Sequence, residues 1–310
     1  MSTYQPSPVR STRLAGLSLL LGAQLAVGAA AIFARYALTA AQPLAVAALR
    51  LIVAAAVLLA ISAVTRNRLK LSRPTRVILI VAGLALAVHF ATWISSLEYT
   101  TIATSTLLVC TTPIWTSLYD AAVLRRRLPS AVWLAYFVGA IGLWLIVGVV
   151  GSPPPIPGHQ LLGAALALVG SLAIGTYFIL VRTVRASLAT TSIVTWTYGW
   201  AAIGLTIAAL AARQPPPPLH ATTAWIGILA MALVSQLLGH TAMNASLRWF
   251  SPSAIAMATL LEPIFAAVLA AAIFGERLTA QALLGGVILL VAIGVVLIYE
   301  SPPTPELKLD

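Results

Sequence analysis

The sequence has 310 residues, of which 60% are hydrophobic and only 8% are charged. Soluble domains usually carry about 25% charged residues, so this composition excludes a soluble enzyme or a soluble binding domain. The net charge of +11 does not indicate nucleic-acid binding, because the basic residues lie in short loops between apolar segments, where they act as topology signals.

Ten apolar segments follow one another along the chain, and each is close to the roughly 20 residues that a membrane-spanning helix needs. We predict helices at 14–35, 43–64, 76–97, 101–123, 130–150, 160–182, 189–211, 223–246, 253–274 and 278–299. The first segment follows Arg10 and Arg13 as a signal peptide would. It continues without a clear end to its apolar core, so we expect a retained first span.

Charge or proline content predicts the connections between these helices. The predicted loops are Arg66–Arg76, Arg125–Arg127, Gly151–Pro157 and Pro215–Pro218, and the polar segment Ser301–Asp310 is expected to be a short free tail.

Lysine and arginine are distributed unevenly between the two sides that alternate along the ten spans. One side collects fourteen of the 18 basic residues, the other has only Arg35, Arg213 and Arg277, and Arg50 lies within the second span. Because cytoplasmic loops are enriched in Lys and Arg, both termini are predicted to be cytoplasmic, with the loop at 151–159 outside. The asymmetry favours an even number of spans, since removing one span would mix the two sides.

The second half of the chain repeats the first at a constant offset of 150 residues. The stretch SLEYTTIATSTLLVCTTPIW at 96–115 aligns without gaps with SLRWFSPSAIAMATLLEPIF at 246–265, which pairs Pro113 with Pro263. A repeat of five spans is odd-numbered, so the second copy must insert in the opposite orientation. We therefore predict an all-α integral membrane protein with ten transmembrane helices in two inverted five-helix repeats, 1–152 and 153–310, around a central cavity.

Polar residues inside the spans are few, and each needs a partner or a water-filled cavity because its desolvation is costly. His89 and Trp93 are four residues apart and share a face of the third span, and His240 and Asn244 repeat that spacing on the eighth. The two histidines are separated by nearly the repeat offset, so both faces are predicted to line one cavity. In the alternative, these side chains only form hydrogen bonds to neighbouring helices. The further cavity candidates are Gln24, Tyr177 and Gln236.

Two charged residues and two prolines within the spans are also candidates. Glu262 could bind a cationic group, hold a proton or pair with a basic group of the protein. Arg50 is a candidate partner for a substrate carboxylate; in the alternatives it pairs with an acid or a helix C-terminus of the protein, or extends its charged end outward. Pro113 and Pro263 each remove a backbone hydrogen bond at the same place in their repeats, so they are candidate hinges.

Enzyme chemistry is not indicated by any motif in the sequence. It has no nucleotide-binding loop, no metal-ligand cluster and no catalytic triad, and its one cysteine, Cys110, cannot form an internal disulfide. We therefore expect a protein that is not an enzyme and that holds no metal or cofactor.

Three stretches resemble the drug/metabolite transporter superfamily, in particular its bacterial ten-span EamA-type exporters. They are LRLIVAAAVLL at 49–59, HFATWISSLEYTTIA at 89–103 and LEPIFAAVLAAAIFGERLTAQALLGGVILLVAIGVVLI at 261–298. The first repeat departs from this pattern, because Arg125-Arg126-Arg127 stands where the second has Gly275-Glu276.

The resemblance implies a secondary transporter of the bacterial inner membrane that exports small metabolites, most often amino acids and in some members aromatic amino acids. Its partners would then be a small-molecule substrate and the lipid bilayer, with no nucleic acid. We expect a monomer, because the internal repeat supplies a central path within one chain. The alternatives are an integral-membrane enzyme, a flippase for lipid-linked substrates, or a passive channel, which is more often a ring of identical subunits.

Overall fold

The computed structural model describes residues 8–65, 71–100, 102–125, 127–147, 158–274 and 280–299, and these residues form helices joined by short connections without any strand. Several predicted features lie outside the described residues: Arg66–Lys70 of the first basic loop, Arg126, the loop at 151–157, Gly275-Glu276 and the tail at 301–310.

The helices of the first half are α1 (Pro8–Gly28), α2 (Ala30–Ala37), α3 (Pro43–Val64), α4 (Arg73–Tyr99), α5 (Ile102–Val109), α6 (Thr112–Ala122) and α7 (Ser130–Val147). Those of the second half are α8 (Gln160–Val184), α9 (Thr190–Ala211), α10 (Thr222–Ala230), the π-helix η1 (Met231–His240), α11 (Thr241–Ser246), α12 (Pro252–Ala258), the 3₁₀-helix η2 (Thr259–Leu261), α13 (Glu262–Phe274) and α14 (Ala280–Tyr299).

Six helical stretches of the described chain are long and apolar enough to cross a membrane. They are Leu14–Ala37, Pro43–Val64, Arg73–Tyr99, Gln160–Val184, Thr190–Ala211 and Thr222–Ser246. Shorter apolar helices occupy Ser130–Leu145, Pro252–Ala266 and Leu283–Tyr299. The fourth predicted span, 101–123, is divided into α5 and α6, neither of which reaches that length.

The start of α4 differs from the prediction of a loop up to Arg76. The helix begins at Arg73, because Ser72 is an N-cap whose hydroxyl accepts a hydrogen bond from the backbone N–H of Thr75 at 3.4 Å. Pro74 fits the first turn, where a helix leaves its N–H groups without helical partners. Charge content alone therefore placed this boundary too late in the chain.

Apolar side chains cover the outside of the molecule, and polar ones are buried within it. Phe137 and Leu210 are 67% and 73% exposed, whereas Gln24, Arg50 and Asn244 are fully buried. This is the reverse of a soluble protein, and it fits a bundle whose surroundings are lipid. The chain is therefore a multi-pass membrane protein.

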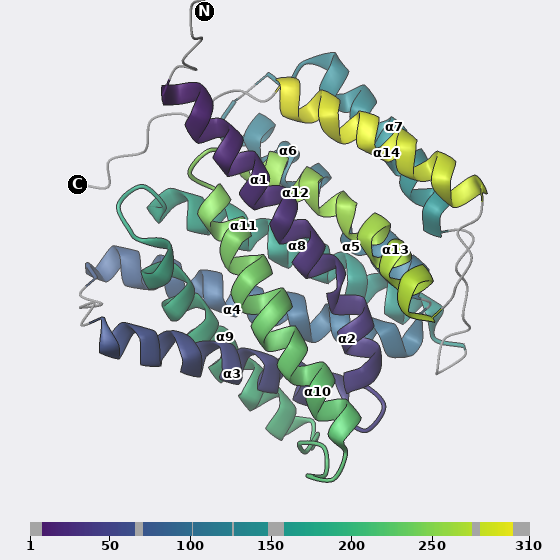
Figure 1. Cartoon of the computed structure of the whole chain (residues 1–310). Coiled ribbons are helices and arrows are strands. Elements are labelled where there is room, and N and C mark those ends of the chain that lie inside the picture. Colours follow the sequence, from purple (N-terminus) through teal and green to yellow (C-terminus); the bar gives the residue numbers. More distant parts are fainter. Residues whose placement is uncertain are drawn as a thin grey trace, which may run out of the picture.

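The helix contacts between the two halves come in repeat-related pairs. Helix α4 of the first half packs on α8 of the second, and in the equivalent contact the α10–η1 stretch of the second half packs on α1 and α2 of the first. Two more pairs, α3 with α9 and α7 with α14, join equivalent helices of the two halves directly, and Figure 1 shows α7 and α14 side by side at one edge of the bundle. The two halves are thus arranged as repeats around a common centre.

Glycines in α7 define the relative direction of the α7–α14 pair. A Cβ atom added at Gly142 would lie 2.8 Å from the carbonyl oxygen of Gly285, whereas one added at Gly139 would lie 3.4 Å from the Cβ of Ala292. Residue numbers therefore fall along α7 as they rise along α14, so these two repeat-related helices are antiparallel.

Candidate functional site

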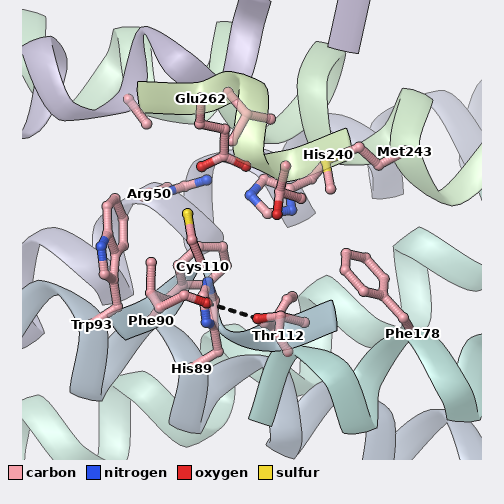
Figure 2. A pocket seen from close by; sticks show the side chains of 15 residues that line it. Arg50, His89, Phe90, Trp93, Cys110, Thr112, Phe178, His240, Met243 and Glu262 are labelled. Carbon is pink, nitrogen blue, oxygen red and sulfur yellow. Dashed lines mark hydrogen bonds between the residues drawn. The ribbon is translucent and has the colours of Figure 1, made fainter. Parts of the chain in front are cut away.

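A cavity lies between helices of both halves (Figure 2). Its wall consists of Val27, Ala30, Arg50, His89, Phe90, Trp93, Val109, Cys110, Thr112, Ile174, Phe178, His240, Met243, Thr259 and Glu262. Apart from Arg50 on α3, these residues come from repeat-related stretches: α1–α2 and α8, α4 and η1–α11, and α5–α6 and η2–α13. The cavity therefore lies where equivalent helices of the two halves meet.

Four breaks in regular α-helix converge on this cavity. The α1–α2 break follows Gly28, and the α5–α6 break is at Cys110-Thr111. In the second half, η1 passes into α11 after His240, and η2 precedes Glu262. Residues at or within two positions of every break belong to the cavity wall. Non-α geometry in a membrane helix leaves backbone groups to be satisfied in other ways, and it is typical of functional sites.

The two proline breaks have local causes in the sequence. Pro113 has no N–H to bond the carbonyl of Val109, and the Thr112 hydroxyl donates to that carbonyl instead at 2.8 Å. Pro263 likewise cannot bond the carbonyl of Thr259, which accepts from the backbone N–H of Glu262 in the tighter turn of η2. The predicted equivalence of the prolines thus corresponds to equivalent breaks in the fourth and ninth stretches.

The break in the eighth stretch has no proline, and a tertiary contact from Tyr198 on α9 reaches it. The carbonyl of Gln236 accepts hydrogen bonds at 3.4 Å from the Tyr198 hydroxyl and from the Thr241 hydroxyl. Gln236 lies within the π-helical η1, where its carbonyl also accepts the i+5 bond from the backbone N–H of Thr241.

Arg50 and Glu262 are the charged side chains among the described residues of the wall. Arg50 is fully buried, and its guanidinium carbon lies 4.1 Å from the centre of the Phe90 ring. None of its three guanidinium nitrogens forms a hydrogen bond within the described structure. Figure 2 shows the Glu262 carboxylate entering from the second half, beside this guanidinium.

The predicted histidines both belong to the cavity wall, together with Trp93. His89 donates from Nδ1 to the carbonyl of Gly170 at 2.9 Å, which ties α4 to α8, and its ring stacks on Trp93 at 6.1 Å. The ring of His240 meets that of Phe90 edge-on at 5.3 Å, and its Nδ1 has no hydrogen-bond partner among the described residues. His240 can therefore still accept or donate a hydrogen bond.

Several predicted residues lie behind the wall. Tyr177 donates to Asn244 Oδ1 at 2.8 Å, and Asn244 donates to the carbonyl of His240 at 2.7 Å, so both are satisfied by the protein. Gln24 and Gln236 are fully buried without side-chain hydrogen bonds in the described structure. Pro113 and Pro263 adjoin the cavity residues Thr112 and Glu262 but do not line it.

The remaining wall residues were not predicted. The internal repeat could have identified the two threonines of the wall, because Thr112 is equivalent to Glu262 and Thr259 to Val109 at the offset of 150. No sequence feature distinguishes the aromatic and apolar wall residues, such as Phe90, Phe178 and Met243, since similar side chains occur on every span.

Comparison with known proteins identifies the family. The model of the EamA-like transporter family matches residues 14–148 and 161–299, one match in each half. Twenty-nine chains of solved structures also match. One crystal structure has a TM-score of 0.76 over 92% of this chain and 97% of the other, at 15% sequence identity, which shows a shared fold. Among curated proteins, none matches.

Two family matches, one in each half, account for the repeated helix contacts and for the cavity that lies between the halves. The chain belongs to the EamA-like transporter family and has the fold of its membrane transporters.

Proposed function

We propose that the protein exports small metabolites, and amino acids in particular, across the bacterial inner membrane by alternating access between two inverted five-helix repeats. The observation that carries the proposal is the convergence of four helix breaks from both halves on one cavity. Broken helices at the interface of inverted repeats are where secondary transporters bind their substrates.

The ten-span topology with cytoplasmic termini is part of this proposal. The antiparallel packing of α7 and α14 supports it, because equivalent helices of inverted repeats must run in opposite directions. The distribution of lysine and arginine supports the orientation.

A polar contact between the repeats supports a closed inner side. Ser253 at the start of α12 donates to the buried carboxylate of Asp120 near the end of α6 at 3.0 Å. In the proposed topology both groups lie on the cytoplasmic side of the cavity. Opening towards the cytoplasm would separate them, whereas opening outward would leave them together.

Counterflow in proteoliposomes tests the proposal. Vesicles with the purified protein and internal unlabelled amino acid should take up the same radiolabelled amino acid faster than protein-free vesicles or protein-containing vesicles without internal substrate. A panel of amino acids, with and without a proton gradient, identifies the substrate and the coupling. Flux without counterflow would indicate a channel, and chemical conversion without flux would indicate an enzyme; either result would refute the proposal.

A further inference from the structure

The guanidinium of Arg50 is a buried cation whose hydrogen-bonding capacity is unused. All three nitrogens are without a hydrogen-bond partner in the described structure, and one face of the group lies over the Phe90 ring at 4.1 Å. A guanidinium that is covered on its face still has its N–H groups along its edge. Those groups match the two oxygens of a carboxylate.

Glu262 supplies the opposite charge from the other repeat. Its carboxylate lies beside Arg50 in Figure 2, but the two are not joined by a hydrogen bond. Each group can therefore take a separate partner within the same cavity. Because a carboxylate only accepts hydrogen bonds, its natural ligand is a cationic donor such as an ammonium group.

A free α-amino acid carries both complementary groups on one carbon atom. Two opposite charges that lie side by side can receive its carboxylate and its ammonium group together. The rest of the wall is largely apolar, with Trp93, Phe178 and Met243 among its larger side chains. A substrate side chain with a further charge would be buried there without a partner, at a high cost in free energy.

We infer that Arg50 and Glu262 bind the two ends of a zwitterionic amino acid, carboxylate on Arg50 and ammonium group on Glu262, with an apolar or aromatic side chain against the remaining wall. This inference rests on the proposed function and adds the recognition mode to it. It also makes substrate binding a bridge between the two repeats, since Arg50 belongs to the first and Glu262, next to Pro263, to the second.

Analogues that lack one end of the zwitterion test the assignment. In wild-type proteoliposomes, competition against radiolabelled L-phenylalanine is measured with unlabelled phenylalanine, phenylethylamine, which lacks the carboxylate, and 3-phenylpropionate, which lacks the ammonium group. We expect each analogue to compete at least about tenfold more weakly than phenylalanine, because it leaves one buried charge without its partner.

Substitution of each charged residue should reduce the discrimination against a different analogue. Glu262→Gln should weaken competition by phenylalanine more than competition by 3-phenylpropionate, so that the difference in potency between these two compounds falls several-fold. Arg50→Gln should weaken competition by phenylalanine more than competition by phenylethylamine, so that the difference in potency between those two compounds falls several-fold. Thr195→Val is the control: it removes a buried hydroxyl that bonds its own helix and lies off the cavity wall, so it should leave both ratios unchanged.

The possible failures are distinguishable. If the wild-type protein moves no amino acid, the proposed function itself is refuted. If it moves amino acids but does not discriminate against either analogue, the zwitterion assignment is wrong. This test uses only the wild-type protein. Unchanged ratios in Glu262→Gln, a substitution that keeps the shape of the side chain, would also overturn it.

Discussion

Polar side chains around the cavity fall into two groups, according to whether the protein supplies their hydrogen bonds. Tyr177 and Asn244 are satisfied within the bundle, whereas Arg50 and the Nδ1 atom of His240 have no such partner in the described chain. A satisfied pair in a membrane interior stabilises the fold, and an unsatisfied group on a cavity wall is available to a ligand.

The substitution Tyr177→Phe should separate these two roles. It removes the bond to Asn244 Oδ1 and leaves a buried amide oxygen without that donor, which should lower the free energy of unfolding by about 1 kcal/mol. The Michaelis constant for transport should not change, because Tyr177 lies behind the wall. Thr176→Val, at the exposed neighbouring position, is the control for stability measured by thermal unfolding in detergent. A selective rise in the Michaelis constant of Tyr177→Phe would instead place its hydroxyl in the binding site.

Helical spacing predicted part of the cavity because α4 is a regular α-helix, in which His89 and Trp93 share a face. The same rule was less useful on the eighth stretch. His240 ends a π-helix, and its i→i+5 bonding turns the side chains differently from an α-helix. Gln236, four residues before His240 in this π-helix, therefore lies behind the wall. Asn244 lies in the α-helix α11, where its amide bonds to Tyr177 and to the carbonyl of His240 behind the wall. The sequence contains no proline or glycine pattern that predicts this π-helix.

At the scale of helices, the breaks before Pro113 and Pro263 are the candidate hinges. Replacing either proline with alanine provides an N–H that competes for the carbonyl of Val109 or Thr259 and should stiffen the break. We expect substrate binding to survive and exchange across the membrane to slow several-fold, measured as the rate of counterflow. Pro252→Ala is the control, since Pro252 is in the first turn of α12, where an N–H has no helical partner. Equal exchange rates in all three variants would show that the prolines are not hinges.

The contact between α7 and α14 depends on glycine. A Cβ at Gly142 would lie 2.8 Å from the carbonyl oxygen of Gly285 and 2.9 Å from the backbone N of Leu289, which cannot move as a side chain would. Gly142→Ala should lower the free energy of unfolding by about 1–3 kcal/mol. Gly286→Ala meets no atom within 4 Å and should be neutral or stabilising in the same thermal unfolding assay. Equal effects of the two substitutions would contradict this packing.

At the scale of the whole molecule, the proposed orientation assigns each connection to one side of the membrane. Leu219, 90% exposed between α9 and α10, should face outward, and the exposed Ser187 between α8 and α9 should face the cytoplasm. In a Cys110→Ala background, an impermeant thiol reagent added to intact cells should label Leu219→Cys and not Ser187→Cys. If only Ser187→Cys were labelled, the topology would be the inverse of the proposed one.

The sequence predicted the repeat and the helical segments because both depend on local apolar content and on a register of 150 residues. It predicted only some of the residues that meet across the centre, His89, Trp93 and His240 among them, since the rest depends on how α1–α2, α8 and the broken helices approach one another. Gly28 is an example: a Cβ there would lie 2.8 Å from the Cβ of Phe265 and 3.2 Å from the carbonyl oxygen of Glu262, so this glycine lets α1 reach the site.

The central claim is that one cavity between the repeats opens to each side of the membrane in turn and binds amino acids. Cys110 is the one cysteine of the chain and part of the cavity wall, and it is only 5% exposed. The decisive measurement is the rate at which an impermeant thiol reagent modifies Cys110 in right-side-out and in inside-out membrane vesicles. Alternating access predicts modification from both sides, slowed in both by a transported amino acid. Modification from one side only, or rates that no transported amino acid changes, would contradict the account.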